Sequence, residues 1–188
     1  MSSLPAVITH RYHPSRGIGG NVCDLPEAEA ERILQSLRAM GRGLRPDYLR
    51  KRLRTEDWLI SAKNEKLGPT PLLRPVYFFL GDFTAAEDPS RPAALVMPLA
   101  AFPPDCLTFT YADSMTSHQL GIIDIDHLSR AESHHGRVFT RTEIAEVIAT
   151  LGLPQDQWRI NAGAWRDLFF EVQVWDDRPI REWIAKAG

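Results

Sequence analysis

The spacing of apolar and polar residues predicts a series of short strands. Residues 107–111 alternate cleanly between the two classes, which is typical of a strand with one buried face. Residues 75–80 are apolar at nearly every position, as expected of a central strand. Pro98 indicates that residues 94–99 form an edge strand or a strand end. Further strands are expected at residues 7–12 and 168–175, and Ile122 and Ile123 are expected to continue the sheet.

Apolar residues recur at helical spacing in other segments. Two of these segments begin with a predicted capping box, one formed by Asp24 with Glu27 and the other by Thr140 with Glu143. Pro46 suits the first turn of another helix. The predicted helices span residues 24–40, 46–60, 140–151 and 177–184, whereas residues 63–74 are expected to form an exposed connection.

These helices and strands are mixed without the regular alternation of a doubly wound sheet. We therefore expect an α+β fold in which a mixed or antiparallel sheet packs with about four helices. The chain is 44% apolar and 24% charged, which is the composition of an ordinary globular protein. No break in composition divides residues 1–188, so a single domain is expected.

Net charge and cysteine content exclude several classes of protein. A net charge of −2 excludes the global positive field of a constitutive nucleic-acid binder. Cys23 and Cys106 have neither the spacing of a zinc site nor that of a disulfide framework. No secretory signal begins the chain, and no segment approaches the roughly 18 apolar residues of a membrane span. These features favour a cytoplasmic protein without a membrane partner.

A local basic patch lies between Arg42 and Arg54, where six cations face the single acid Asp47. Such a patch could follow a nucleic-acid backbone or hold a pyrophosphate. The alternative is a solvated helix face whose arginines pair with nearby acids such as Glu56 and Asp57. Both interpretations stay open on the sequence.

Two other motifs are weak. The Gly17–Gly20 segment lacks both the Gly-x-Gly-x-x-Gly spacing and the following helix of a dinucleotide-binding loop, so a flexible turn is expected. Asp124 and Asp126 have strand spacing and are expected at an exposed edge.

Histidines give a further metal hypothesis. His127, Glu132, His134 and His135 offer metal-binding side chains. Adjacent histidines cannot converge from one helix face as His-x-x-x-His does, so no metal is expected. A metal-assisted hydrolase that uses the three histidines is nevertheless a distinct functional hypothesis.

Glu171 is the most informative residue because it interrupts an apolar strand. Ionised groups are seldom buried unless they are paired, so this carboxylate faces solvent, a partner or a cleft. One interpretation is a half-exposed strand, with Phe170, Val172 and Val174 packed inward and Glu171 and Gln173 outward. The other interpretation is a catalytic carboxylate in a cleft.

The segment Asp113–Ser117 concentrates small polar residues directly after a predicted strand. Such a loop can present hydroxyl and amide groups to a ligand. It can equally form an Asx or Ser/Thr turn that satisfies its own backbone, and the pattern favours this second interpretation.

The order of these motifs resembles that of the ADP-ribosyltransferase superfamily, and most nearly the DarT-type toxins that modify DNA bases. In that family an early His-Thr-type strand, an arginine-bearing helix, a Tyr-Phe strand, a Phe-Thr-Asp-Gly-like segment and a late glutamate strand follow one another. The matching stretches here are Ile8–His10, Tyr48–Arg54, Arg74–Phe79, Phe109–Met115 and Phe170–Val174.

This resemblance implies an α+β enzyme that transfers ADP-ribose from NAD to an acceptor. It implies Glu171 and Arg52 as catalytic residues, with Glu171 stabilising an oxocarbenium-like transition state. A nucleic-acid base is the preferred acceptor because of the Arg42–Arg54 patch. The residues expected to bind NAD are Thr9, His10, Arg50, Arg54, Tyr77, Phe78, Asp113 and Ser114.

Within that set, Tyr77 or Phe78 is expected to stack on nicotinamide, and one of Arg50, Arg52 and Arg54 is expected to hold the pyrophosphate. Two departures from the family pattern support an alternative function. Val7 stands where the family has histidine, and residues 81–83 replace the usual continuation of the Tyr-Phe strand. The alternative is a non-catalytic domain on the same scaffold that binds a nucleotide or a protein partner.

Overall fold

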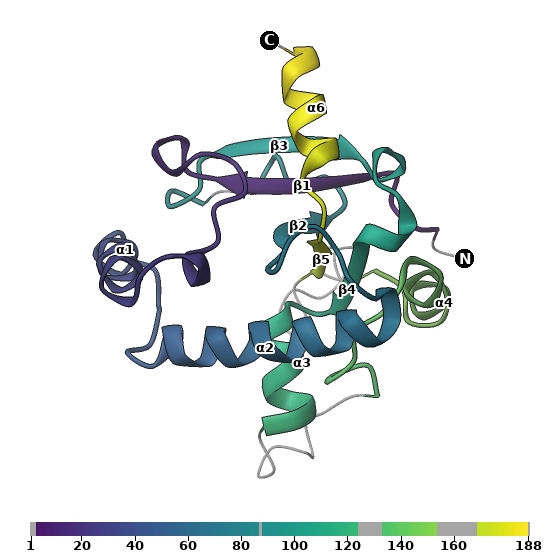
Figure 1. The fold of residues 1–188 in the computed structure, drawn as a ribbon, viewed down its shortest axis with the longest axis horizontal. Coiled ribbons are helices and arrows are strands. Elements are labelled where there is room, and N and C mark those ends of the chain that lie inside the picture. Colours follow the sequence, from purple (N-terminus) through teal and green to yellow (C-terminus); the bar gives the residue numbers. More distant parts are fainter. Residues whose placement is uncertain (1–2, 87, 124–132, 154–168, 188) are drawn as a thin grey trace.

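Five antiparallel strands form one sheet in the order β3-β1-β2-β5-β4 (Figure 1). The computed structural model describes residues 3–86, 88–123, 133–153 and 169–187. The strands are β1 Val7–Tyr12, β2 Val76–Leu80, β3 Ala93–Pro98, β4 Leu107–Tyr111 and β5 Phe170–Val174. The predicted strands are therefore confirmed, with β2 paired on both sides as a central strand and β3 at an edge, where Pro98 is tolerated.

Helices lie on both sides of this sheet. In the described part of the chain they are α1 Glu27–Ala39, α2 Tyr48–Leu67, α3 Ser114–His118, α4 Arg141–Leu151 and α6 Arg178–Ala187. Figure 1 shows α2 along one side of the sheet and α6 on the opposite side. The α+β class is thus confirmed, and α3 is a short helix where the pattern indicated a turn. None of the described helices has both the length and the apolar character that crossing a membrane requires.

The two faces of the sheet differ in polarity. One face is apolar and packs with α4 and α6, in a core that includes Phe78, Phe109 and Val172. The other face carries polar side chains, because strand register pairs Thr110 with Glu171 and Thr108 with Gln173 there. Alternation along β5 thus directs one set of residues into the core and Glu171 towards α2 and α3.

The strands β1 and β2 separate after a short ladder. Their register pairs Ile8 with Leu80 and Thr9 with Phe79, whereas β1 and β3 pair over the whole range from Val7 to Tyr12. Beyond Thr9 the two strands diverge. The residues on either side of this opening line part of a cavity.

The predicted capping box at Asp24 is wrong. The segment Val22–Asp24 forms a 3-10 turn, and α1 begins at Glu27 after Pro26 without a side-chain cap. The turn has its own cap, because the side chain of Asn21 accepts a hydrogen bond from the amide of Cys23. Asp24 is instead 3.3 Å from the guanidinium of Arg74.

Helix α2 is longer than predicted and crosses much of the expected connection. It continues to Leu67 and ends at Gly68, whose positive φ of 74° suits a glycine. Packing holds the added turns, since the ammonium of the buried Lys63 lies 5.2 Å from the Trp175 ring. The expected exposed segment 63–74 is therefore helical up to Leu67.

The prediction that Ile122 and Ile123 continue the sheet is wrong. They end a single π-helical turn, Gln119–Ile123, that follows α3 directly. Gly121 in this turn lies against the backbone of Gly136, which leaves no room for a side chain at that position. In contrast, the capping box at Thr140 is confirmed, and Gly152 ends α4 as predicted.

Candidate active site

A cavity of about 680 Å³ lies between the polar face of the sheet and the helices α1 and α2. This volume is in the range of small-molecule sites. The sequence-predicted residues that line it are His10, Arg52, Tyr77, Phe78, Asp113 and Glu171. Residues from β1, β2, α2, β5 and the start of α3 therefore converge on one space.

Glu171 is buried in the wall of this cavity, with 8% of its surface exposed. Its carboxylate accepts hydrogen bonds from the Ser114 amide at 3.4 Å and from the Gln173 side chain at 3.1 Å. Burial raises the pKa of Glu171, against the opposing charge of Arg52. The interpretation of a half-exposed strand is therefore wrong for both Glu171 and Gln173, because α2 and α3 cover this face.

Arg52 connects the helix α2 to this carboxylate. Its Nε is 3.2 Å from a carboxylate oxygen of Glu56, and its Nη1 donates to the Ser114 hydroxyl at 3.2 Å. Its guanidinium carbon also lies 4.1 Å from the centre of the Tyr77 ring, a cation–π contact. A buried arginine with this many partners is fixed in place and directs its positive field at Glu171.

Glu56 is a site residue that the sequence pattern marks only as a pairing partner for arginines. Its side chain is fully buried at 0% exposure, and the Tyr77 hydroxyl donates to its Oε1 at 2.6 Å. Asn21 donates to the same oxygen at 3.1 Å. The sequence could have identified Glu56 by its position four residues after Arg52, because residues four apart lie on one face of a helix.

A chain of hydrogen bonds between side chains of β4 and β5 ends at Glu171 and holds its carboxylate in place. The Trp175 indole donates to the Thr108 hydroxyl at 2.8 Å, and that hydroxyl donates to the Gln173 carbonyl at 3.0 Å. Because this fixes the carbonyl end of Gln173, its amide nitrogen is directed at Glu171 and Thr110. Gln173 therefore supports the carboxylate.

His10 bridges the opening between β1 and β2 as a neutral ring. Its Nδ1 is 2.7 Å from the Tyr77 carbonyl, which can only accept, so Nδ1 carries the proton. Its Nε2 then accepts from the Gly19 amide at 3.1 Å. Burial lowers the pKa of His10. The Gly17–Gly20 turn thus contacts this histidine, with Gly19 at a positive φ of 84°.

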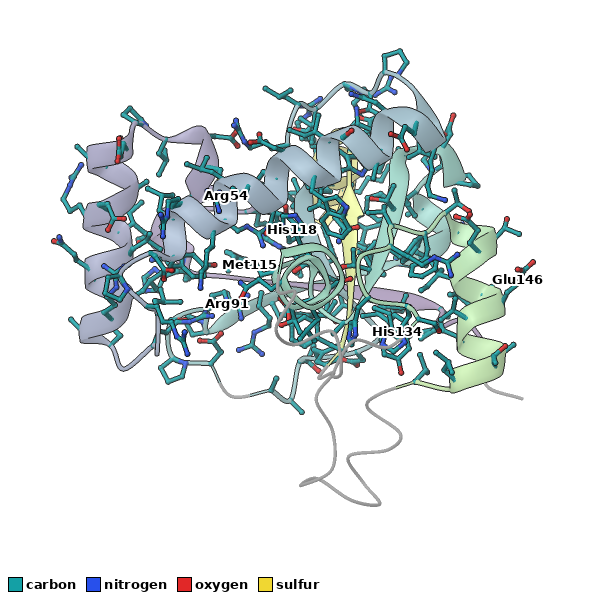
Figure 2. The ribbon with its side chains drawn as sticks, turned by 90° about the horizontal axis from the view of Figure 1, so that it is seen from below. Arg54, Arg91, Met115, His118, His134 and Glu146 are labelled. Carbon is teal, nitrogen blue, oxygen red and sulfur yellow. The ribbon has the colours of Figure 1, made fainter. Side chains whose placement is uncertain are left out.

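Some predicted site residues are absent from the described cavity lining. Thr9 donates instead to the Gly81 carbonyl at 2.7 Å and accepts from the Phe83 amide. Ser114 acts through its contacts with Arg52 and Glu171. Arg50 has 69% of its side chain exposed, beside Asp47, and Arg54 is exposed on α2 (Figure 2).

The cations of the Arg42–Arg54 patch therefore point in different directions. Arg42 lines the cavity and lies 3.5 Å from Asp88, whereas Lys51 pairs with Asp47 at 3.2 Å. Arg52 pairs with Glu56, as the interpretation of a solvated helix face expects, but both side chains are buried rather than solvated.

The polar segment after β4 caps its own helix. The Asp113 carboxylate accepts from the Thr116 amide at 3.0 Å, which makes it the N-cap of α3. The segment satisfies its own backbone, as the second interpretation expects, but as the first turn of a helix, and its Ser114 amide donates to Glu171.

The histidine cluster packs with aromatic rings. His134 lies 4.1 Å from the Tyr111 ring and 4.3 Å from the His135 ring, measured between centres, and both histidines are buried. His127, Glu132, Asp124 and Asp126 lie outside the described residues. Within the described residues, no group of three or more His, Cys, Asp or Glu side chains could hold a metal ion.

Comparison with known proteins adds no relative from which a role could be carried over. No protein-family model matches the chain, and no match was found among curated proteins or among solved structures. The assignment of function therefore depends on the chemistry of the cavity.

Proposed function

We propose that the protein is an ADP-ribosyltransferase-like enzyme that uses NAD as the donor substrate. The observation that carries this proposal is the buried Glu171 carboxylate, which shares one cavity wall with Arg52 and Tyr77. A carboxylate in a water-poor site has the greatest effect where positive charge develops during the reaction. The cleavage of NAD develops such a charge.

In the proposed reaction, the bond between C1′ of the ribose and the nicotinamide nitrogen breaks. Neutral nicotinamide leaves with the electron pair, and the ribose becomes oxocarbenium-like, as in glycoside hydrolysis. Glu171 stabilises this cation and then accepts the proton that the acceptor loses on attacking C1′. The raised pKa of Glu171 suits it to that second role.

Other cavity residues have supporting roles in this proposal. Tyr77 supplies an aromatic surface for the nicotinamide ring, and its pKa is raised chiefly by burial, so the phenol stays neutral. Arg52 contacts Ser114 and Glu56, and so fixes the residues behind the Glu171 carboxylate and the Tyr77 ring. We propose a nucleic-acid base as the acceptor. The exposed Arg50 and Arg54 lie outside the cavity lining, where they can attract the phosphates of a nucleic acid.

A second candidate is a non-catalytic domain that binds a nucleotide or a protein partner in the same cavity. The observation in its favour is that Arg52, Tyr77 and one oxygen of Glu56 already contact one another within the protein. Such a domain would bind its ligand saturably and leave it unchanged.

The test is to incubate the protein with NAD, alone and with single-stranded or double-stranded nucleic acid, and to measure nicotinamide release and labelled product. Glu171→Gln is expected to lower the rate by about 10²–10³-fold. Glu146→Gln is the matched control, since Glu146 is exposed on α4 and points away from the molecule (Figure 2). Equal rates for Glu171→Gln and the unmodified protein would overturn the proposal.

A further inference from the structure

Three arginines from separate segments line the same cavity. They are Arg16 after β1, Arg42 between α1 and α2, and Arg91 before β3. All three contact the short segment that carries Asp88 and Ser90. Arg16 donates to the Ser90 carbonyl at 2.8 Å, Arg42 donates to the Ser90 hydroxyl at 3.1 Å, and Arg91 is 2.8 Å from the Asp88 carboxylate.

Within the described part of the chain, the arginine cluster of Arg16, Arg42 and Arg91 contacts a single acid, Asp88. Burial alone would raise the pKa of Asp88, yet its bonds from Ser90 and Arg91 and the charge of Arg42 lower it to about 2. Asp88 is therefore ionised at neutral pH, and among the described residues it is the one carboxylate in ion-pair contact with any of the three guanidinium groups. The pKa of Arg16 is lowered by burial and then by Arg42 and Arg91, as expected of crowded cations.

The cluster also keeps hydrogen-bond donors free for a ligand. Arg91 contacts Asp88 through Nε, and within the described part of the chain its two terminal nitrogens have no protein acceptor. Its backbone is held by Arg11, which is buried and donates to the Arg91 carbonyl at 3.0 Å. A guanidinium fork that is held this way suits the two oxygens of a phosphate.

An apolar wall adjoins the cluster in this cavity. It is formed by α1, the turn before it and the start of α2, and its members are Val22, Leu25, Ile33, Leu34, Leu37, Leu44 and Tyr48. Figure 2 shows Arg91 and Met115 in the space between α1 and α3, and both line the cavity. A ligand that fits has an anionic group for the arginines and a flat, weakly polar ring for this wall.

We propose that the arginine cluster binds the diphosphate of a ligand that contains a nucleoside diphosphate group. The base of that ligand lies against the apolar wall formed by α1 and its neighbouring segments. This inference deepens the proposed function and rests on it, since NAD carries such a group. It reassigns the diphosphate contact from Arg50 and Arg54 on α2 to three arginines outside that helix.

The test measures binding, so that it does not depend on turnover. Calorimetry of the full chain with ADP, inorganic pyrophosphate and adenosine separates the two halves of the site. Arg42→Gln and Arg91→Gln are each expected to raise the Kd for ADP and for pyrophosphate by about tenfold or more, the loss of one charge-assisted contact. The Kd for adenosine is expected to stay within about twofold.

Arg50→Gln and Arg54→Gln are the matched controls, as arginines of α2 outside the described cavity lining. They are expected to leave the Kd for ADP unchanged, and circular dichroism checks that every variant is folded. Absence of pyrophosphate binding to the unmodified protein, or an unchanged Kd for ADP in both Arg42→Gln and Arg91→Gln, would overturn the site. ADP binding through the cluster without turnover of NAD would instead overturn the proposed function and leave the site standing.

Discussion

At the residue scale, two buried glutamates of the site have different surroundings. Glu171 accepts from an amide and a side-chain amide, and burial raises its pKa. Glu56 accepts from Tyr77 and Asn21 at one oxygen, which also lies 3.2 Å from Nε of Arg52. The first carboxylate faces the cavity, and the second organises Arg52 and Tyr77. Their different roles follow from packing, since both are the same residue type.

The raised pKa of Glu171 predicts the pH dependence of activity and stability. An acid with a raised pKa in the folded state is favoured in its protonated form, so stability falls as pH rises from the ordinary 4.5 through the raised value. We expect Glu171→Gln to unfold at higher urea concentration than the unmodified protein at pH 7, with a smaller gain at pH 4. If the proposed function holds, the unmodified protein loses NAD cleavage as pH falls through the same window.

This prediction is checked by urea denaturation and by a pH–rate profile for nicotinamide release. An identical stability difference at pH 4 and pH 7 would contradict it.

The Tyr77 hydroxyl gives a second prediction at this scale. Tyr77→Phe removes the 2.6 Å bond to the buried Glu56 and leaves that carboxylate short of a donor. We expect a loss of about 1–3 kcal/mol in the free energy of unfolding. Tyr12→Phe is the control, because no described residue hydrogen-bonds to its hydroxyl. Chemical denaturation measures both, and equal losses in the two variants would argue against the role of Glu56.

At the element scale, the position of β5 between β2 and β4 makes the site possible. The neighbouring β4 supplies Thr108 and Thr110 to Gln173, and β5 itself supplies Glu171 and Trp175. Helices α2 and α3 then cover this polar face around Glu171 and Gln173, and both side chains are buried. The neighbouring β4 therefore holds Gln173, and Gln173 in turn holds the Glu171 carboxylate.

The strand network predicts that Gln173 acts on Glu171 as a positioning residue. Gln173→Met keeps a side chain of similar volume and removes the bond to Glu171 at 3.1 Å. We expect kcat to fall by up to about a hundredfold, with KM for NAD nearly unchanged, because the group positions the carboxylate. Steady-state kinetics of nicotinamide release separate the two constants, and a change confined to KM would contradict this role.

Close backbone contact predicts a stability effect at Gly121. A Cβ there would lie 2.2 Å from the Gly136 nitrogen, so the π-helical turn and the segment before α4 would have to separate. We expect Gly121→Ala to lower the free energy of unfolding by about 1–3 kcal/mol. Gly43→Ala is the control, since nothing lies within 4 Å of its added Cβ. Thermal unfolding of both variants checks the difference.

At the scale of the whole molecule, the cavity carries a positive wall although the chain has a net charge of −2. Arginines from three segments meet where β1 leaves β2 and α1 closes the space. An anionic ligand is therefore attracted by local geometry rather than by the total charge. A bound ligand would connect the sheet to α1 and stabilise the fold as a unit.

Ligand binding should accordingly raise the melting temperature. At a hundredfold excess over Kd, a ligand of the native state adds about 2.7 kcal/mol of stability. We expect NAD to raise Tm in both the unmodified protein and Glu171→Gln, and to raise it less in Arg42→Gln. Differential scanning fluorimetry measures these shifts, and an equal rise in Arg42→Gln would contradict the placement of the diphosphate.

Local patterns in the sequence were sufficient for the strands, for the helix that begins at Thr140, and for Glu171 as a carboxylate within an apolar strand. They misplaced the start of α1, the end of α2 and the turn at Ile122, because caps and packing by distant residues override local preference there. They also left open which arginine of α2 lines the cavity.

Tertiary structure alone decided the character of the site. Glu56 meets Tyr77 across 21 positions of the chain, Arg52 meets Ser114 across 62, and Arg16 meets Ser90 across 74. Periodicity describes neighbours three or four residues apart on a helix and two apart on a strand, so contacts at these separations have no signature in it. The sequence by itself determined which face of β5 carries Glu171, and only the packing of α2 and α3 over that face buried the carboxylate beside Arg52.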